Sequence, residues 1–361
     1  MVDIRIKRLA KILVEHSARV KKGETVAINA STEAIPLALE CYKLVMKKDA
    51  FPKVNFNAPG FNYNYYKYAS FEQLNHYPKI AEFEAKNIDA EINIGGSVNT
   101  KEMTNIDPQK VAIRRKIVRP ISEIVMKRNR WVICQYPTNS LAQDAELSLE
   151  EMEDFCYKAT NQDWEKKGKE QEKIRKIIDK GKTVRIEDDD TNITFSIDGM
   201  KAINSCGRHN MPDGEIFTAP LKFSTEGYIH FSFPAIYGGR EVSGITLTFE
   251  RGKVVKARAV KNEKYLKSML NIDNGSKYVG EFGIGTNYGI KRFIKRILFD
   301  EKIGGTIHLA LGSAYEECLG TAKPQQHNKS ALHWDMIKDL RKGGAIYIDN
   351  KMVQMNGKFM I

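Results

Sequence analysis

His333 and Asp335 are separated by one residue in the segment HNKSALHWD, and both side chains can bind a metal ion. In an extended segment, residues two apart face the same side, so these two side chains would project together. An imidazole nitrogen beside a carboxylate is a usual pair of ligands for zinc, cobalt, manganese or iron. A surface turn is the alternative interpretation, and the motif alone does not decide between them.

Three further side chains stand in surroundings where a polar group needs a partner. His308 lies in the strand-like run GGTIHLALGSAY, Glu215 follows a glycine in PDGEIFTAP, and Glu281 is enclosed by glycines and apolar residues in YVGEFGIG. Burying a lone carboxylate is unfavourable unless it is ion-paired or bound to a metal. For His308 the alternatives are a hydrogen-bonded core histidine and a metal ligand. Each of the three is therefore a candidate ligand.

Other motifs fit known sites poorly. The segment GIGTNYG at 283–289 has the spacing G-x-G-x-x-x-G, lies late in the chain and follows no clear apolar strand, so a dinucleotide site is rejected. The chain contains neither HExxH nor G-x-S-x-G, which excludes helical zincins and the nucleophile elbow. The acidic triplet at 188–190 falls between two alternating segments and predicts a turn with solvated charge.

The composition is that of a globular protein, with 42% hydrophobic and 28% charged residues. Five scattered cysteines, never arranged as CxxC, argue against disulfides and a cysteine zinc site, so we expect a cytoplasmic location. The first 22 residues mix charge through their apolar positions and predict an amphipathic helix rather than a signal peptide. The net charge of +12 is diluted by 45 acidic residues, and no run approaches the roughly 18 apolar residues of a membrane span. We therefore expect neither a nucleic-acid nor a membrane partner.

The elements that must position these side chains change character along the chain. In residues 1–180, helical patterns alternate with short apolar strands, which predicts an α/β domain with a parallel, helix-covered sheet and a connecting helix at 149–180. In residues 181–361, alternating segments with turn signals predict an α+β domain rich in antiparallel strands. All candidate ligands fall in this second domain, which is therefore the predicted catalytic domain.

Four sequence blocks, in their order along the chain, carry a resemblance to a known family. They are DGEIFTAP (213–220), GEFGIGTN (280–287), IHLALGSAY (307–315) and NKSALHWD (328–335). Together they resemble metallopeptidase family M29, the thermophilic aminopeptidases, and the resemblance extends over the whole chain. It implies a two-metal centre for divalent Zn²⁺, Co²⁺ or Mn²⁺ and a catalytic tyrosine at Tyr315. The ligands that the resemblance implies are Glu215, Glu281, His308, His333 and Asp335.

The resemblance also implies a mechanism and a partner. Two divalent cations would activate a water molecule and polarise the scissile carbonyl, and the free α-amine of a short peptide would bind one of them. Cleavage would then be restricted to the first residue. Tyr315 would donate a hydrogen bond to the oxyanion, and Glu281 would act as a ligand alone or also carry the proton. The family further implies a homodimer that encloses its active sites.

Two other classes of function remain as alternatives. Proteins related to the family are ring-cleaving dioxygenases of hydroxylated pyridines, with one Fe(II) on two histidines and a carboxylate, here His308, His333 and Asp335. Glu215 and Glu281 argue against this, because a mononuclear site does not need two further buried carboxylates. A non-enzymatic basic binding protein would show salt-dependent affinity and no response to chelation. The complete ligand set argues against an inactive family member.

Overall fold

The computed structural model describes residues 2–360, which form two compact units. The first unit runs to Gln162 and includes Gly207–Pro212, and the second contains Asp163–Cys206 and the chain from Asp213 onward. Helix α9 (Trp164–Lys180) therefore belongs to the second unit, whereas the sequence placed the boundary after residue 180. Its apolar residues Ile174 and Ile178 are part of the hydrophobic core of that unit.

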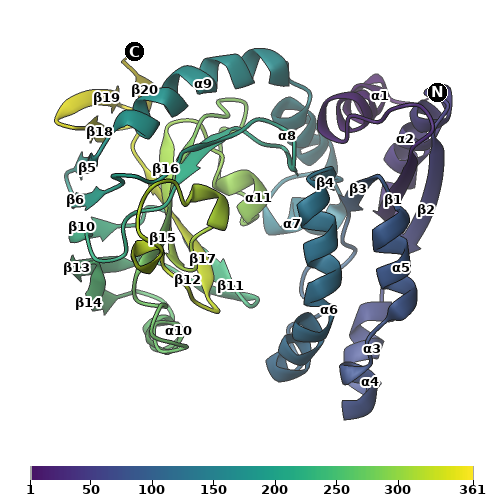
Figure 1. Ribbon diagram of the computed structural model, residues 1–361, viewed down its shortest axis with the longest axis horizontal. Coiled ribbons are helices and arrows are strands. Elements are labelled where there is room, and N and C mark those ends of the chain that lie inside the picture. Colours follow the sequence, from purple (N-terminus) through teal and green to yellow (C-terminus); the bar gives the residue numbers. More distant parts are fainter. Residues whose placement is uncertain (1, 361) are drawn as a thin grey trace. The chain divides into compact units, whose positions relative to one another are not determined.

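The first unit is built on a parallel sheet, shown in purple and blue in Figure 1. Strand order is β2-β1-β3-β4-β8, and every neighbouring pair is parallel. The strands are β1 (Thr25–Ser31), β2 (Phe51–Asn57), β3 (Ala90–Gly95), β4 (Trp131–Gln135) and β8 (Asn210–Met211). The α-helices are α1 (Ile4–Lys11), α2 (Ile35–Lys47), α3 (Phe61–Tyr68), α4 (Phe71–Asn75), α5 (Lys79–Asn87), α6 (Pro108–Arg128), α7 (Asn139–Asp144) and α8 (Leu149–Thr160). Parallel strands require such crossover helices, and the predicted α/β fold is confirmed.

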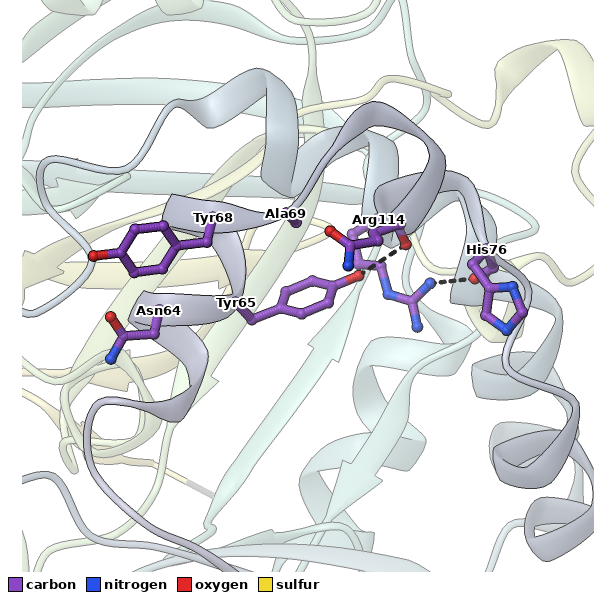
Figure 2. A pocket seen from close by; sticks show the side chains of 7 residues that line it. Asn64, Tyr65, Tyr68, Ala69, His76 and Arg114 are labelled. Atoms are coloured by element: carbon purple, nitrogen blue, oxygen red, sulfur yellow. Dashed lines mark hydrogen bonds between the residues drawn. The ribbon is translucent and has the colours of Figure 1, made fainter.

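A pocket lies among helices α3, α4 and α6 of this unit (Figure 2). Tyr65 donates a hydrogen bond to the Gln73 carbonyl at 3.2 Å, and Arg114 donates one to the His76 carbonyl at 2.5 Å. Helix α3 buries none of its residues, so its aromatic side chains remain at the surface. The pocket lining includes tyrosine, arginine, histidine and amide side chains but no carboxylate.

The second unit contains the predicted antiparallel sheets. An eight-stranded sheet has the order β14-β13-β10-β6-β5-β18-β19-β20, and a five-stranded sheet has the order β17-β16-β15-β9-β7. The strands of the larger sheet are β5 (Thr183–Asp188), β6 (Thr191–Ser196), β10 (Glu226–His230), β13 (Thr246–Glu250), β14 (Lys253–Arg258), β18 (Ala345–Ile348), β19 (Lys351–Met355) and β20 (Lys358–Phe359). Those of the smaller sheet are β7 (Ile203–Ser205), β9 (Glu215–Thr218), β15 (Val279–Gly285), β16 (Thr306–Gly312) and β17 (His333–Asp339). A hairpin of β11 (Ala235–Tyr237) and β12 (Arg240–Val242) and the helices α10 (Glu263–Met269) and α11 (Ile297–Asp300) complete the unit.

The apolar core of this unit joins the two larger sheets. Side chains of both sheets belong to one buried cluster, and the rings of Phe195 on β6 and Phe282 on β15 meet edge to face with centroids 5.1 Å apart. Trp334 of β17 is buried in the same cluster, as expected for a packing residue. Because strand side chains alternate, the neighbours of Phe282 and Trp334 along their strands point to the opposite face. That opposite face carries the polar side chains described below.

The acidic triplet at 188–190 forms the predicted turn between β5 and β6, but its charge is not simply solvated. Lys338 on β17 is buried, and its Nζ lies 2.7 Å from Asp188 Oδ2 and 2.5 Å from Asp190 Oδ1. The turn therefore neutralises a buried lysine. All five cysteines are free thiols. Within residues 2–360, helices long and apolar enough to cross a membrane are absent.

Candidate metal centre

Strand register places the predicted ligands on one face of the five-stranded sheet. Glu281 on β15 pairs with Ala310 on β16, and Ala310 pairs with Asp335 on β17. Glu215, the first residue of β9, pairs with Gly285 at the end of β15. Residues paired across strands share a face, so these three carboxylates point to the same side. A small residue separates Glu281 from Asp335, which leaves room between their side chains.

The two imidazoles are also paired with glycines. His308 on β16 stands opposite Gly283 on β15, and His333 on β17 stands opposite Gly312 on β16. A Cβ atom on Gly283 would lie only 2.1 Å from ring atoms of His308. The glycine therefore provides the space that the imidazole ring occupies. Glycines 283 and 285 of the rejected dinucleotide motif serve close packing around the candidate ligands instead.

Each imidazole is oriented through its Nδ1 atom. His308 Nδ1 lies 3.1 Å from the Glu301 carbonyl oxygen, and His333 Nδ1 lies 2.8 Å from the Ser313 carbonyl oxygen. A carbonyl only accepts, so each neutral ring carries its proton on Nδ1 and leaves Nε2 as a bare acceptor. Metal-binding histidines commonly donate their other ring N–H to a carbonyl in this way, which fixes the orientation of the ring.

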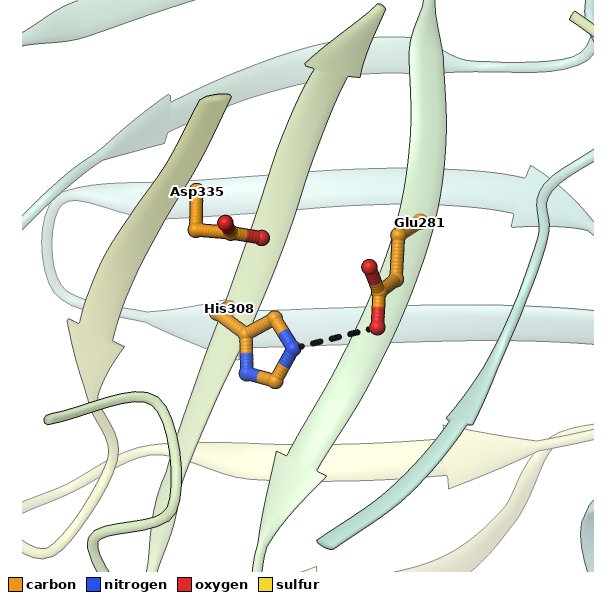
Figure 3. Close-up of side chains that lie close together, drawn as sticks. All are labelled: Glu281, His308 and Asp335. Atoms are coloured by element: carbon orange, nitrogen blue, oxygen red, sulfur yellow. Dashed lines mark hydrogen bonds and ion pairs between the residues drawn. The ribbon is translucent and has the colours of Figure 1, made fainter. Parts of the chain in front are cut away.

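Both Nε2 atoms face carboxylate oxygens. Figure 3 shows the contact between His308 and Glu281, with Asp335 beside them. His308 Nε2 lies 3.5 Å from Glu281 Oε1 and 3.6 Å from Glu215 Oε2. His333 Nε2 lies 3.1 Å from Glu281 Oε2 and 3.5 Å from Asp335 Oδ1. Glu281 thus directs one oxygen toward each imidazole, so that two groups of three ligand atoms share a single carboxylate.

These distances fit divalent cations. Two ligand atoms held about 2.1 Å from one tetrahedral ion stand roughly 3.4 Å apart, close to the four separations observed. One atom each of Glu281, His308 and Asp335 lies within 4.8 Å of the others. Glu215 Oε2 and Asp335 Oδ1 are buried and have no hydrogen-bond partner. Buried carboxylate oxygens without a partner are unfavourable, and a cation would satisfy both.

The pKa shifts of the cluster show that its buried carboxyl groups favour a positive charge beside them. Burial disfavours the charged form and raises the pKa of Glu215 to about 8. Burial also opposes the charge of His308, but the hydrogen bond with Glu281 and the nearby carboxylates raise its pKa to about 9. Despite its burial, Asp335 has its pKa lowered to about 2 because His333 lies beside it. Without metal, protonated imidazoles supply the positive charge beside the carboxylates. A metal ion would displace these protons, so metal binding should release protons.

Tyr315 follows β16 and caps the short 3₁₀ helix Glu316–Cys318. Its ring centroid lies 4.9 Å from that of His333, and 44% of the residue is exposed. Desolvation by the surrounding protein and the nearby carboxylates raise the pKa of Tyr315, so the phenol keeps its proton. The buried His327 orients this turn, because its Nε2 donates a hydrogen bond of 2.9 Å to the Tyr315 carbonyl.

Two residues of the cluster, Glu301 and Lys302, were missed from the sequence. Lys302 is fully buried, and its Nζ donates to Glu215 Oε1 at 3.1 Å and to Glu301 Oε1. The available signal was the adjacent pair of opposite charges in DEKIGG, directly before the apolar strand β16. Lysine is rarely buried, so the pair gave no reason to expect a contact inside the fold.

Comparisons with known proteins identify the family of the chain. The family model described as thermophilic metalloprotease (M29) matches residues 2–359. Aminopeptidase AmpS of Bacillus subtilis is 28% identical over 348 residues, which cover 85% of this chain and 83% of that protein.

Two solved structures share the fold. AmpT of Thermus thermophilus aligns with a TM-score of 0.86 at 21% identity and covers 99% of both chains. The 2,5-dihydroxypyridine dioxygenase of Pseudomonas putida aligns at 0.61 with 13% identity and covers 98% of this chain and 96% of its own. The predicted α/β and α+β architecture is thereby confirmed. With a family model that spans nearly the whole sequence, the chain belongs to the thermophilic metalloprotease (M29) family and is a metalloaminopeptidase.

Proposed function

We propose that this enzyme releases the N-terminal residue of short peptides at a centre of two divalent cations, either Zn²⁺, Co²⁺ or Mn²⁺. The observation that carries the proposal is that each imidazole Nε2 faces two carboxylate oxygens, with Glu281 common to both groups. One imidazole with two carboxylate oxygens can hold one ion, and two such sets of ligands that share Glu281 can hold two ions side by side. The proposed ligands are Glu215, Glu281, His308, His333 and Asp335.

The residues around the centre have separate tasks. When bound, a pair of divalent cations supplies an activated water molecule and polarises the carbonyl of the scissile bond. Glu281 is the proposed bridging ligand, because its two oxygens diverge toward different imidazoles. Tyr315, with a protonated hydroxyl, is the proposed donor to the developing oxyanion.

A small cavity lies next to the centre, with a volume of about 20 Å³, which is enough for about one water molecule. Asp335 forms part of its wall, and Ile337 lies on the same face of β17. The rest of the wall is largely apolar, with Lys295 and Asp300 as its charged residues. The remaining lining residues are Pro234, Ala235, Ile236, Phe293 and Ile297. The cavity is too small for a leucine side chain, so it does not define the preferred first residue.

Metal content and peptidase activity together test the proposal. We expect about two divalent ions per chain, loss of both ions and of leucine release from a leucyl arylamide on chelation, and recovery with added Co²⁺ or Zn²⁺. Metal analysis and arylamide hydrolysis should be followed on the same samples. A single iron with oxygen consumption on a dihydroxypyridine would replace the proposal with the dioxygenase. Activity that survives complete chelation would also refute it.

Replacing Tyr315 with phenylalanine tests its role as a donor. Removal of one oxyanion donor typically lowers kcat about 10²–10³-fold, and the ring contact with His333 would be kept. We therefore expect a decrease in kcat of that order on a leucyl arylamide, with metal content and KM little changed. Tyr278→Phe is the matched control, because that ring meets Phe223 edge to face and lies outside the ligand cluster. A Tyr315→Phe enzyme with normal kcat would assign the ring to packing alone.

The location and assembly predicted from the sequence remain part of the proposal. We propose a cytoplasmic homodimer whose interior admits short peptides and excludes folded proteins. The five scattered cysteines, never arranged as CxxC, are the basis for expecting a reducing compartment. Light scattering would give the mass of the assembly, and a mass of one chain would contradict the dimer.

A further inference from the structure

We propose that Lys302 is a positioning residue of the metal centre, which fixes one oxygen of Glu215 so that the other faces the cation beside His308. The inference rests on the proposed two-cation function and extends it to a side chain that is not itself a ligand. In this arrangement a buried ammonium determines how a neighbouring carboxylate meets the metal.

Lys302 contacts only one of the two side-chain oxygens of Glu215. Lys302 is 0% exposed at its side chain, and its Nζ lies 3.1 Å from Glu215 Oε1. The second oxygen, Glu215 Oε2, lies 3.6 Å from His308 Nε2 and has no hydrogen-bond partner. One oxygen is therefore held by the lysine while the other is presented to the site. A carboxylate held in this way offers a single oxygen rather than chelating through both.

The residue before Lys302 orients the other ligand of the same ion. The backbone carbonyl of Glu301 faces His308 Nδ1 at 3.1 Å, and the Glu301 side chain contacts Lys302 Nζ. Two consecutive residues thus position both His308 and Glu215, one through its main chain and the next through its side chain. Such outer-shell contacts commonly change metal affinity or activity about 10–100-fold when they are removed.

The Glu301–Lys302 segment is itself anchored to the strand that carries Glu215. The Lys302 carbonyl accepts a hydrogen bond of 3.0 Å from the Asn287 backbone amide. The Asn287 side chain donates one of 2.8 Å to the carbonyl of Asp213, two residues before Glu215. Lys302 and Glu215 are therefore connected by a short hydrogen-bonded path, so their separation is set by the backbone as well as by their own ion pair.

The test replaces Lys302 with methionine, which is of similar length but has neither charge nor donor. Co²⁺ is titrated into metal-free protein, and the visible absorption of the bound ions is recorded. We expect the affinity for one of the two Co²⁺ ions to fall about 10–100-fold, with a changed spectrum for that ion and little change in the other. Hydrolysis of a leucyl arylamide should fall in parallel.

Lys338→Met provides a matched control on the same sheet. Lys338 is also a buried lysine with two carboxylate partners, Asp188 and Asp190, but it lies on the face of β17 opposite Asp335. Its loss should lower thermal stability and leave both Co²⁺ affinities and the spectrum unchanged. A general effect of removing a buried lysine would appear in both variants.

A double variant, Lys302→Met with Glu301→Gln, shows whether Lys302 acts by positioning Glu215 or only by balancing charge. It also provides a second protein to measure if Lys302→Met alone does not fold. It removes an ion pair from both sides, which disturbs a protein less than removing one partner. The Glu301 backbone carbonyl that orients His308 is retained. We expect the double variant to keep the weakened site, because Glu215 still lacks its donor. If either variant binds both Co²⁺ ions with wild-type affinity, the role of Lys302 is refuted but the proposed two-ion function is not. A wild-type protein that binds fewer than two Co²⁺ ions would overturn the proposed function as well.

Discussion

Replacing Glu281 with glutamine should remove both of the proposed metal ions and nearly all activity. The two oxygens of Glu281 face different imidazoles, at 3.5 Å from His308 Nε2 and 3.1 Å from His333 Nε2. Glutamine keeps the shape of glutamate, but it has one neutral oxygen and an NH₂ group that cannot bind a cation. The carboxylate that the two proposed metal positions share would therefore be lost. We expect a loss well beyond the roughly 10–100-fold typical of an outer-shell partner. Metal per chain and kcat/KM on a leucyl arylamide are the measurements.

A matched variant shows whether this loss is specific. Glu250→Gln makes the same change at an exposed position on β13 of the larger sheet, and it should retain full metal content and activity. The Glu281→Gln protein should also remain folded, because glutamine fills the same space in the buried site, and thermal unfolding checks this. Two ions and near-normal turnover in Glu281→Gln would rule out Glu281 as the bridging ligand.

The second large effect is expected from a single methyl group at Gly283. Its Cβ would lie 2.1 Å from His308 Cε1 and Nε2, far inside van der Waals contact, so the ring must move away from the carboxylates. Gly283→Ala should therefore lose the ion beside His308 and reduce activity by at least about 10²-fold, with a loss of stability of about 1–3 kcal/mol from overpacking. Co²⁺ titration, arylamide hydrolysis and thermal unfolding measure the three effects.

Gly95→Ala is the control for this substitution. Gly95 ends strand β3 in the other unit, and the nearest atom to an added Cβ lies at an ordinary 3.4 Å. The control should keep two ions and normal turnover. If Gly283→Ala behaves like Gly95→Ala, the His308 ring does not depend on the space left by the glycine, and its place as a ligand is in question.

The sequence predicted the architecture because the relevant signals are local. Helix and strand periodicity, turn residues and glycine positions appear within short windows, and they distinguish the parallel from the antiparallel half. Glu215, Glu281 and His308 attracted notice because charged or titratable groups stand in apolar runs. Their combination into one ligand set came from the family resemblance, since no local pattern says which distant segments pair.

The features that were missed depend on strand register and on contacts across the sheet. The pairing of Gly283 with His308 joins residues 25 apart in the chain and follows a bulge between Val279 and Glu281, which no periodicity reveals. Lys302 lies far from Glu215 in sequence but contacts it in the fold. The unit boundary also differed, because the contacts of α9, and not its composition, assign it to the second unit.

The proposed ligands come from four adjacent strands, β9, β15, β16 and β17, whose other face forms the core. Bound ions would therefore cross-link these strands on one face of the sheet, although the strands are distant along the chain. At a free ion concentration 100 times the dissociation constant, each such site adds about 2.7 kcal/mol to the folded state. The heat resistance of this half of the molecule would then follow the supply of divalent cation in the cell.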